Sequence, residues 1–240
     1  MNILQSTRNN TPNAVTCCNL LSGALACVAA FHAFEPWWWG LQGYQVAFVL
    51  IALAAVFDFF DGFTARLLHA VSPLGKELDS LSDAVSFGLA PGMVLYNMLV
   101  QYEPESGVAY IAMLIPVFGA LRLAKFNVST DQSTTFTGLP IPANAIFWIG
   151  VVAWNVDFRY IGDALMTALV VLFPLLMVSS LPMFSLKVKT LSLRSNVRRY
   201  ALLLGTAMLV AAMQLAGLLW AIVFYILLSA TERRDEQNRQ

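Results

Sequence analysis

The sequence predicts an all-α membrane protein, a polytopic bundle of about eight transmembrane helices. Of its 240 residues, 58% are hydrophobic and 12% are charged, and the apolar residues form blocks of about twenty rather than short periodic stripes. A helix of that length crosses the roughly 30 Å hydrocarbon core of a bilayer. The blocks place the expected spans at 13–34, 44–66, 80–100, 107–126, 139–156, 163–181, 199–214 and 216–231.

The first block holds all three cysteines, Cys17, Cys18 and Cys27. Adjacent cysteines on one helix cannot bridge comfortably, so the sequence offers no disulfide framework. The turn after this block contains three consecutive tryptophans within Glu35–Gly40. Tryptophan favours the headgroup region of a membrane, so we expect this turn to anchor the non-cytoplasmic end of the bundle.

The basic residues predict how the bundle is oriented. If both termini lie on one side, all 14 Lys and Arg residues except Arg159 fall on that side. Cytoplasmic loops are enriched in Lys and Arg, so we expect an integral protein of the cytoplasmic (inner) membrane with both termini inside. The cluster Lys187–Arg199 belongs to this pattern. We expect membrane lipids, but no nucleic acid, among the partners of this chain of zero net charge.

Four aspartates interrupt the second and third blocks near their cytoplasmic ends: Asp58, Asp61, Asp79 and Asp83. A carboxylate in the hydrocarbon region costs about 2.5–3.5 kcal/mol, so four would cost roughly 10 kcal/mol unless a cation neutralises them. Spacings of three and four residues place each pair on one helix face. The short connection between the pairs lets the two helices return antiparallel, so the four carboxylates can converge on one point.

The residues around these acids indicate what they bind. Oxygen ligands without accompanying Cys or His suit Mg²⁺, Mn²⁺ or Ca²⁺ and argue against zinc or copper. Gly62 and Ala65 leave the adjacent helix surface nearly free of side chains, so a flat ligand can approach the backbone. Arg66 adds a planar set of donors suited to phosphate oxygens. Gly75 either lets the connecting loop approach a ligand closely or is a plain turn residue.

Together these residues form one pattern, Asp58-x-x-Asp61-Gly62-x-x-Ala65-Arg66-x8-Gly75-x-x-x-Asp79-x-x-x-Asp83. At every defined position this pattern resembles the signature of the CDP-alcohol phosphotransferases. The resemblance implies the fold of that family and a reaction in which an alcohol displaces CMP from a CDP-activated lipid. It also implies a homodimer.

The resemblance assigns roles to individual residues as well. It implies two divalent ions, Mg²⁺ or Mn²⁺, held by Asp58, Asp61 and Asp79, with Asp83 at or near the second ion and also acting as the general base. The CDP and pyrophosphate groups are expected at Asn13, Gly62, Ala65, Arg66 and Gly75.

Two further stretches, Ala120–Val128 and Phe136–Ala143, resemble the bacterial membrane-bound phosphatidylserine synthases, as do Pro12, Asn13, Thr16 and Asn19. This resemblance implies CDP-diacylglycerol and L-serine as substrates. It extends from about residue 10 to 145, which we expect to form the catalytic core of a single integral membrane domain, residues 1–240. Residues 146–240 would add further spans and a cytoplasmic tail.

Arg122, Lys125 and Asn127 stand at the cytoplasmic end of the fourth block. Arg122 and Lys125 share a helix face and could bind the substrate phosphates or the carboxylate of serine, and we include Asn127 in this expected site. Basic residues also occur at such helix ends for topology alone.

Three other functions compete with serine transfer. The same chemistry could use a phosphorylated acceptor, glycerol 3-phosphate or inositol phosphate. A membrane prenyltransferase also uses acids with Mg²⁺, but it lacks the Gly-x-x-Ala-Arg insert. A divalent-cation transporter would need an acidic path to the far leaflet, whereas these acids end at one face.

Overall fold

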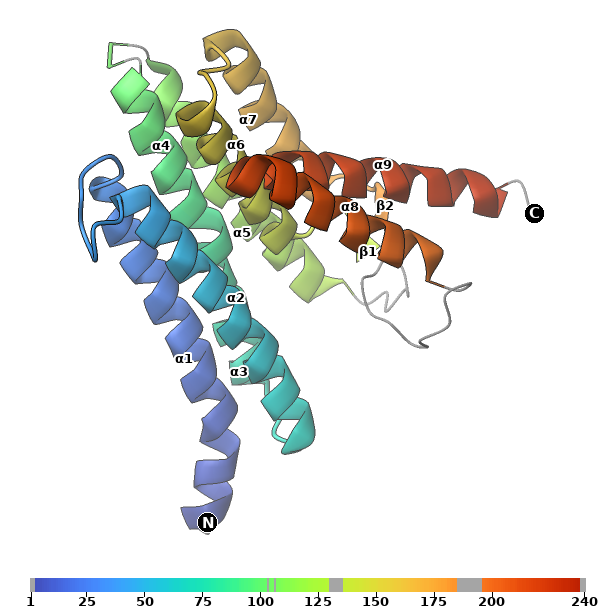
Figure 1. Cartoon of the computed structure of the whole chain (residues 1–240). Coiled ribbons are helices and arrows are strands. Elements are labelled where there is room, and N and C mark those ends of the chain that lie inside the picture. Colours follow the sequence, from blue (N-terminus) through green and yellow to red (C-terminus); the bar gives the residue numbers. More distant parts are fainter. Residues whose placement is uncertain (1–2, 103, 106, 130–135, 185–195, 238–240) are drawn as a thin grey trace. The chain divides into compact units, whose positions relative to one another are not determined.

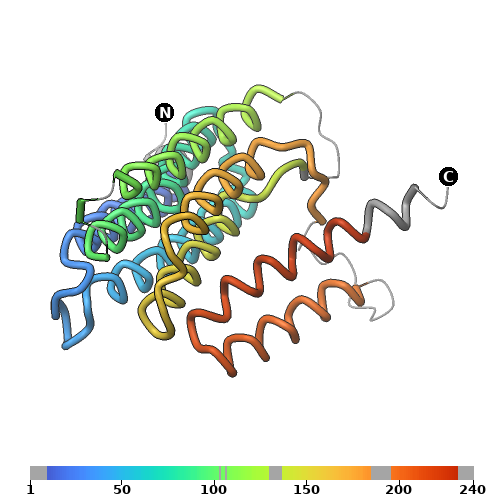
Figure 2. The backbone as a smooth tube through the Cα atoms, turned by 90° about the horizontal axis from the view of Figure 1, so that it is seen from above, coloured from blue at the N-terminus to red at the C-terminus, as the bar shows by residue number. Residues whose placement is uncertain are grey.

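We describe the fold from a computed structural model (Figures 1 and 2). It describes residues 3–102, 104–105, 107–129, 136–184 and 196–237, with side chains from Asn10 to Thr231 within these ranges. The chain divides into two compact units, Met1–Asn127 and Val128–Gln240, each of which is described by itself. Of the basic cluster expected at Lys187–Arg199, the residues Lys187, Lys189 and Arg194 lie outside the described ranges.

The first unit consists of helices that gather around its N-terminal helix. Its elements are α1 (Ile3–Phe31), α2 (Gly43–Leu67), α3 (Pro73–Asp83), the π-helix η1 (Ala84–Leu89), α4 (Ala90–Tyr102), the 3₁₀-helix η2 (Gly107–Met113) and α5 (Leu114–Val128). Helix α1 packs along α2 and also contacts α3, η1 and α4 (Figure 1).

Small residues make the close packing of α1 possible. Ala26, Ala29 and Ala30 are fully buried on α1. A side chain at Gly43, the first residue of α2, would collide with the carbonyl groups of Ala29 and His32. Small residues at helix interfaces let the backbones approach and gain van der Waals contact where water supplies no driving force. These small residues thus let α2, which carries two of the acids, pack tightly against α1.

The second unit contains α6 (Ile141–Asp157), α7 (Asp163–Val178), α8 (Val197–Met213), the 3₁₀-helix η3 (Gln214–Ala216) and α9 (Gly217–Gln237). Strands β1 (Phe136–Thr137) and β2 (Pro182–Met183) pair antiparallel, with Phe136 opposite Met183. Helix α9 packs against α6 and α8, as Figure 2 shows for the red and orange hairpin. The chain reverses between α8 and α9 at Gln214, whose φ is 52°.

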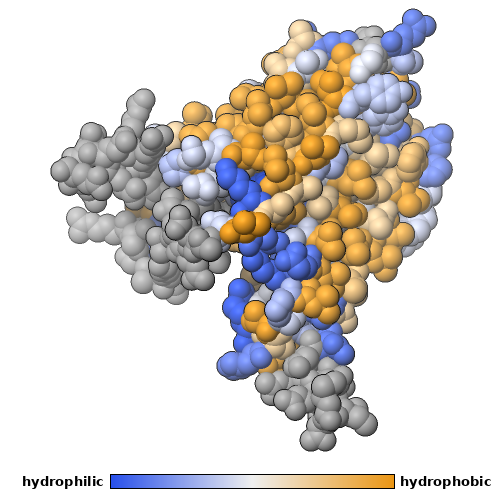
Figure 3. Space-filling view, turned by 180° about the vertical axis from the view of Figure 1, so that it is seen from behind, coloured by the Kyte–Doolittle hydropathy of each residue, from blue (hydrophilic) through white to orange (hydrophobic). Residues whose placement is uncertain are grey.

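The predicted all-α membrane architecture is confirmed in its main features. Each of the eight predicted blocks is helical, but only five helical segments of the described chain are both long and apolar enough to cross a membrane. These are Asn10–Phe31, Gly43–Leu67, Pro73–Tyr102, Gly107–Val128 and Val197–Thr231. Figure 3 shows apolar side chains over much of the visible face.

The difference from eight spans has a physical reason. Helices α6 and α7 have 17 and 16 residues, so each is only about 25 Å long at 1.5 Å per residue, short of the roughly 30 Å hydrocarbon core. The blocks predicted at 199–214 and 216–231 correspond to the separate helices α8 and α9, which lie within one apolar segment, Val197–Thr231, and are joined by the reversal at Gln214. The structure also corrects the third span, whose helix begins at Pro73 rather than at residue 80.

Candidate active site

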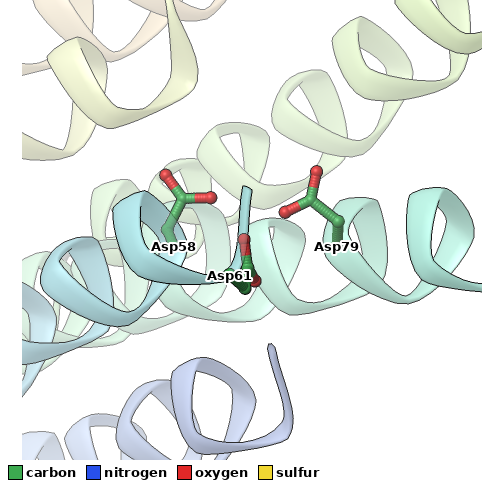
Figure 4. Close-up of side chains that lie close together, drawn as sticks. All are labelled: Asp58, Asp61 and Asp79. Atoms are coloured by element: carbon green, nitrogen blue, oxygen red, sulfur yellow. The ribbon is translucent and has the colours of Figure 1, made fainter. Parts of the chain in front are cut away.

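Three of the four predicted acids meet in the first unit. Asp58 and Asp61 come from α2 and Asp79 from α3, and one carboxylate oxygen of each lies within 4.8 Å of the other two. Figure 4 shows the carboxylates of Asp58 and Asp79 turned toward each other, with Asp61 between them. Both helices pack against α1. The three-residue spacing on α2 brings its two acids to one face, and α3 places Asp79 beside them.

The three carboxylates fit a divalent metal ion. Asp61 is 5% exposed, and its Oδ2 atom is buried with no hydrogen-bond partner among the described residues. A buried carboxylate oxygen without a partner is costly, and a bound cation would remove that cost. The donors are all hard oxygens, as Mg²⁺, Mn²⁺ and Ca²⁺ prefer. The acidic triad could therefore hold a metal ion.

Asp83 lies outside this triad, although we expected it among the four ligands. It is the last residue of α3, immediately before the π-helix η1, and it is 9% exposed. Its Oδ1 accepts a hydrogen bond of 3.3 Å from Nδ2 of Asn19 on α1. Asp83 thus lies one helical turn beyond Asp79 and is hydrogen-bonded to α1. Its roles as a ligand of the second ion and as the base stay predictions.

A pocket opens beside the triad, and its walls come from α1, α2, α3 and the connection between α2 and α3. Its lining residues are Pro12, Asn13, Thr16, Asp61, Gly62, Ala65, Arg66, Ala70, Val71, Ser72, Gly75, Lys76 and Asp79. This set contains every residue that we expected to bind the CDP and pyrophosphate groups, together with two of the triad acids. The structure therefore gathers these residues, far apart in sequence, around one pocket.

Local sequence signals shape the wall formed by α3. Ser72 is the N-cap of α3, and its Oγ accepts a 3.0 Å hydrogen bond from the backbone N–H of Gly75. Pro73 follows at the first helical position, which favours this start. A Cβ at Gly75 would lie 3.1 Å from Oδ1 of Asn13 and 3.2 Å from Oγ of Ser72. Glycine there lets the first turn of α3 approach α1 across the pocket.

Gly62 forms the open part of the opposite wall. A Cβ at this position would have a single near neighbour, the guanidinium of Arg66 at 4.0 Å. The space in front of the backbone is therefore free for a ligand. Arg66 itself is exposed and lines the same pocket. A planar guanidinium beside an open backbone surface is suited to the oxygens of a phosphate group.

The residues expected to bind the acceptor do not line this pocket. Arg122 is half-buried and Lys125 is exposed on α5, and neither lines the pocket. Asn127 joins α5 to α3: its Nδ2 donates to Oγ of Ser80 at 2.8 Å, and its carbonyl oxygen accepts from Nζ of Lys76 at 3.1 Å. The proposed binding roles of Arg122, Lys125 and Asn127 therefore stay predictions.

Several polar residues at the site were not among the predicted site residues. Lys76 lines the pocket, and Asn19 and Ser86 form a buried network at Asp83. The signal for Asn19 was a second polar residue three positions after Thr16, which puts both on one face of an otherwise apolar helix. Ser86 follows Ser82 at a spacing of four, which marks a polar face in the same way.

Comparison with known proteins agrees with this geometry. The family model described as CDP-alcohol phosphatidyltransferase matches residues 9–227. Three similar proteins carry the name CDP-diacylglycerol–serine O-phosphatidyltransferase. The one from Mycobacterium bovis is 34% identical over 227 residues, which cover 88% of this chain and 73% of that protein.

The other two relatives match over shorter stretches. The Mycobacterium leprae protein is 44% identical over 121 residues, 48% of this chain and 40% of its own length. The protein from Methanocaldococcus jannaschii is 47% identical over 105 residues, 43% of this chain and 49% of its own length. These two matches span less than half of the relatives, whereas the family model covers most of the chain. The chain therefore belongs to the CDP-alcohol phosphatidyltransferase family.

Proposed function

We propose that this protein is a phosphatidylserine synthase: it transfers the phosphatidyl group of CDP-diacylglycerol to the hydroxyl of L-serine, forming phosphatidylserine and releasing CMP. One observation carries the proposal. Two acids of the triad, Asp61 and Asp79, border one pocket in the first unit together with the residues expected for the CDP group, and a carboxylate oxygen of Asp58 lies within 4.8 Å of theirs. The similar proteins are named for serine transfer, which supports serine as the acceptor.

In this reaction the serine oxygen forms a bond to the lipid-bearing phosphorus, and the bond from that phosphorus to the CMP oxygen breaks. Asp83 takes the proton of the serine hydroxyl as the general base. Arg66, exposed on the pocket wall, binds phosphate oxygens of the CDP group. The open surface at Gly62 receives the nucleotide, because no side chain fills it. A single in-line displacement needs no covalent intermediate on the protein.

Mg²⁺ or Mn²⁺, in two sites, is the proposed cofactor. Asp58, Asp61 and Asp79 would hold it, with Asp83 at or near the second ion. When bound, the ions would offset the negative charge that develops on the departing CMP. The buried Oδ2 of Asp61, which has no hydrogen-bond partner among the described residues, supports this assignment.

The proposed setting is the cytoplasmic membrane, with both termini and the pocket on the cytoplasmic side and α6 and α7 as additional, short spans in an eight-span bundle. The uneven distribution of Lys and Arg supports this orientation. The lipid would enter from the bilayer and serine from the cytoplasm. We further propose a homodimer and one membrane domain over residues 1–240, with its catalytic core at about 10–145. Arg122, Lys125 and Asn127 would contact the acceptor or the lipid phosphate.

The test is CMP release from CDP-diacylglycerol by the purified protein in detergent with Mg²⁺ or Mn²⁺. Serine is compared with glycerol 3-phosphate, inositol phosphate and no acceptor. We expect release that depends on serine and yields phosphatidylserine. Release with a different alcohol would keep the chemistry and overturn the acceptor. No release with any acceptor from folded protein would overturn the enzyme assignment and favour a cation-transport role for the acids.

A further inference from the structure

Asp83 is connected to a buried polar network that extends beyond the pocket. Asn19 on α1 and Ser86 on η1 both have 0% exposure. Asn19 donates from Nδ2 to Oδ1 of Asp83 at 3.3 Å, and its own Oδ1 accepts from Oγ of Ser86 at 2.7 Å. The three side chains form one chain of hydrogen bonds. It runs from the buried hydroxyl of Ser86 through the amide of Asn19 to the carboxylate of Asp83.

The direction of this chain is fixed at Asp83. An ionised carboxylate can only accept, so the NH₂ end of the Asn19 amide faces Asp83, and a flipped amide would place two acceptor oxygens against each other. The oxygen end of the amide then faces Ser86, whose hydroxyl lies 2.7 Å from Oδ1 of Asn19 and 3.1 Å from the carbonyl oxygen of the same residue.

The backbone around this network leaves little room for movement. Gly23 stands one helical turn after Asn19, and a side chain there would collide with Ser86. Helix α1 and η1 therefore touch at this point. The π-helical turn begins directly after Asp83, at Ala84, and spans Ser86. Such wide turns are often found at functional sites, where they reorient side chains. Here the π-helix carries Ser86, which contacts Asn19.

We propose that Asn19 and Ser86 are positioning residues for Asp83. Asn19 holds one carboxylate oxygen, Oδ1, so that the other oxygen is directed to the hydroxyl of the acceptor, and Ser86 keeps the amide of Asn19 in the donating orientation. Neither residue touches substrate. The inference rests on the proposed function, because it assumes that Asp83 is the base of a phosphatidyl transfer.

The chain provides a matched control, Ser82. Like Ser86, it has 0% exposure, and its hydroxyl contacts a backbone carbonyl of α1, that of Thr16 at 3.3 Å. It also donates to the carbonyl of Leu78 at 2.8 Å. Unlike the bonds of the Ser86 hydroxyl, these bonds of the Ser82 hydroxyl do not involve Asn19. Ser82→Ala and Ser86→Ala thus remove the same group from the same helix interface, but only the second disturbs the network.

The experiment measures CMP release with the active alcohol, together with the thermal midpoint, for four variants: Asn19→Ala, Ser86→Ala, the double variant and Ser82→Ala. Removing the partner that orients an active-site carboxylate costs roughly 10–100-fold in activity or metal affinity. We expect kcat to fall by about this factor for Asn19→Ala, with the KM for CDP-diacylglycerol within about twofold of wild type. Ser82→Ala should retain kcat.

The double variant tests the order of the chain of bonds. If Ser86 acts only through the amide of Asn19, its loss adds nothing once Asn19 is alanine, so the double variant should equal Asn19→Ala in kcat. Independent, multiplied losses would contradict the proposal. Equal losses of kcat in Ser82→Ala and Ser86→Ala, accompanied by equal falls in thermal midpoint, would show a packing role and overturn it.

A second measurement separates this inference from the proposed function. Mn²⁺ binding is titrated by the decrease of the free Mn²⁺ paramagnetic resonance signal, in the absence of substrates. We expect Asn19→Ala to weaken binding at the site near Asp83 by about 10-fold and Ser82→Ala to leave it unchanged. If the wild type released no CMP, the proposed reaction would fail while this binding difference could still support a positioning role. Unchanged binding and unchanged kcat in Asn19→Ala would refute it.

Discussion

The two units of this protein use buried asparagine and serine side chains differently. In the first unit, Asn19, Ser82 and Ser86 make hydrogen bonds between residues that lie 64 to 67 positions apart, on separate helices. In the second unit, the buried side chains of Asn144 and Asn155 make bonds to residues four positions away in the same helix. The first pattern ties separate helices into one site, whereas these bonds of the second unit stay within α6.

The two units also differ in the charge of their buried residues. The buried residues of the first unit include two carboxylates, Asp61 and Asp83. The polar residues buried in the described part of the second unit are neutral, and its core is built around Phe147, Trp148 and Phe173, whose rings are in contact. Burying a charge costs free energy unless hydrogen bonds or an opposite charge compensate for it, and buried charges are often functional. The difference indicates that the first unit holds the chemistry and that the core of the second unit provides packing.

Replacing Asp83, the proposed base, should have the largest effect on activity. Asp83→Asn keeps the shape of the side chain and an oxygen that can accept from Asn19, but it removes the ability to take a proton. We expect turnover to fall by about 10²–10⁴-fold, while CDP-diacylglycerol binding is largely retained. CMP release and lipid binding to the detergent-purified variant measure the two quantities.

The matched change in the second unit is Asp163→Asn at the start of α7. This acid accepts a hydrogen bond from the hydroxyl of Tyr160, so the variant reports the loss of a structural carboxylate. Its turnover should stay near that of wild type. Substantial remaining activity in Asp83→Asn would remove Asp83 from the base role.

Removing a ligand should have the next largest effect. Asp61→Ala deletes the carboxylate whose Oδ2 is buried without a hydrogen-bond partner among the described residues. We expect the metal concentration needed for half-maximal activity to rise at least about 10-fold. The thermal midpoint of the metal-free protein should not fall, because a costly buried carboxylate has been removed.

Glu77→Ala is the control for the metal titration. Glu77 is an exposed acid on α3, two residues before Asp79, and it does not belong to the triad. Its variant should show the wild-type dependence on Mg²⁺ or Mn²⁺. An unchanged metal dependence in Asp61→Ala would exclude Asp61 as a ligand.

A methyl group in the pocket should have a smaller effect. In Gly62→Ala, the new Cβ would enter the open space in front of the α2 backbone, 4.0 Å from the Arg66 guanidinium. We expect the KM for CDP-diacylglycerol to rise about 10-fold. Because Gly to Ala within a helix stabilises by roughly 0.5–1 kcal/mol, the thermal midpoint should be equal or higher.

Gly107→Ala provides the comparison, since a Cβ at Gly107 meets nothing within 4 Å and Gly107 does not line the pocket. Its kinetics should match those of wild type. An unchanged KM in Gly62→Ala would show that the nucleotide does not approach this wall.

The helical fold and the acidic motif could be predicted because both depend on local patterns. Apolar blocks define helices, and the spacing of Asp58 and Asp61 defines a helix face. The number of spans is confirmed only for the five segments of the described chain that are long and apolar enough to cross a membrane. Helices α6 and α7 are apolar but short, so hydrophobicity alone does not decide whether they span.

The details of the site depend on contacts between distant residues. Nothing local indicates that Asp83 is hydrogen-bonded to α1, since its spacing from Asp79 only places the two acids on a shared helix face. The donor is Asn19, 64 residues earlier, which the packing of α1 against α3 and η1 brings near. Arg122 and Lys125 were expected to bind the acceptor or the lipid phosphate; they do not line the pocket, and their role stays a prediction.

The smallest effect on activity should come from an asparagine of the second unit. Asn155 is 2% exposed; its Nδ2 donates to the carbonyl of Val151 at 2.7 Å, and its Oδ1 accepts from the backbone N–H of Ile161 at 2.9 Å. Asn155→Ala removes both bonds, and leaving such groups without a partner costs about 1–3 kcal/mol. We expect a lower thermal midpoint with kcat unchanged for the folded fraction.

This variant and Asn19→Ala make the same chemical change in the two units, which is why the pair is informative. Both asparagines are almost fully buried and each bonds through both ends of its amide. The partners differ: Asn19 lies between a carboxylate of the site and a hydroxyl, whereas Asn155 lies between backbone groups at the end of α6. If the first unit carries the chemistry and the second unit provides packing, kcat should fall mainly in Asn19→Ala. The thermal midpoint should fall mainly in Asn155→Ala. A loss of kcat in Asn155→Ala at unchanged thermal midpoint would mean that the second unit also shapes the active site.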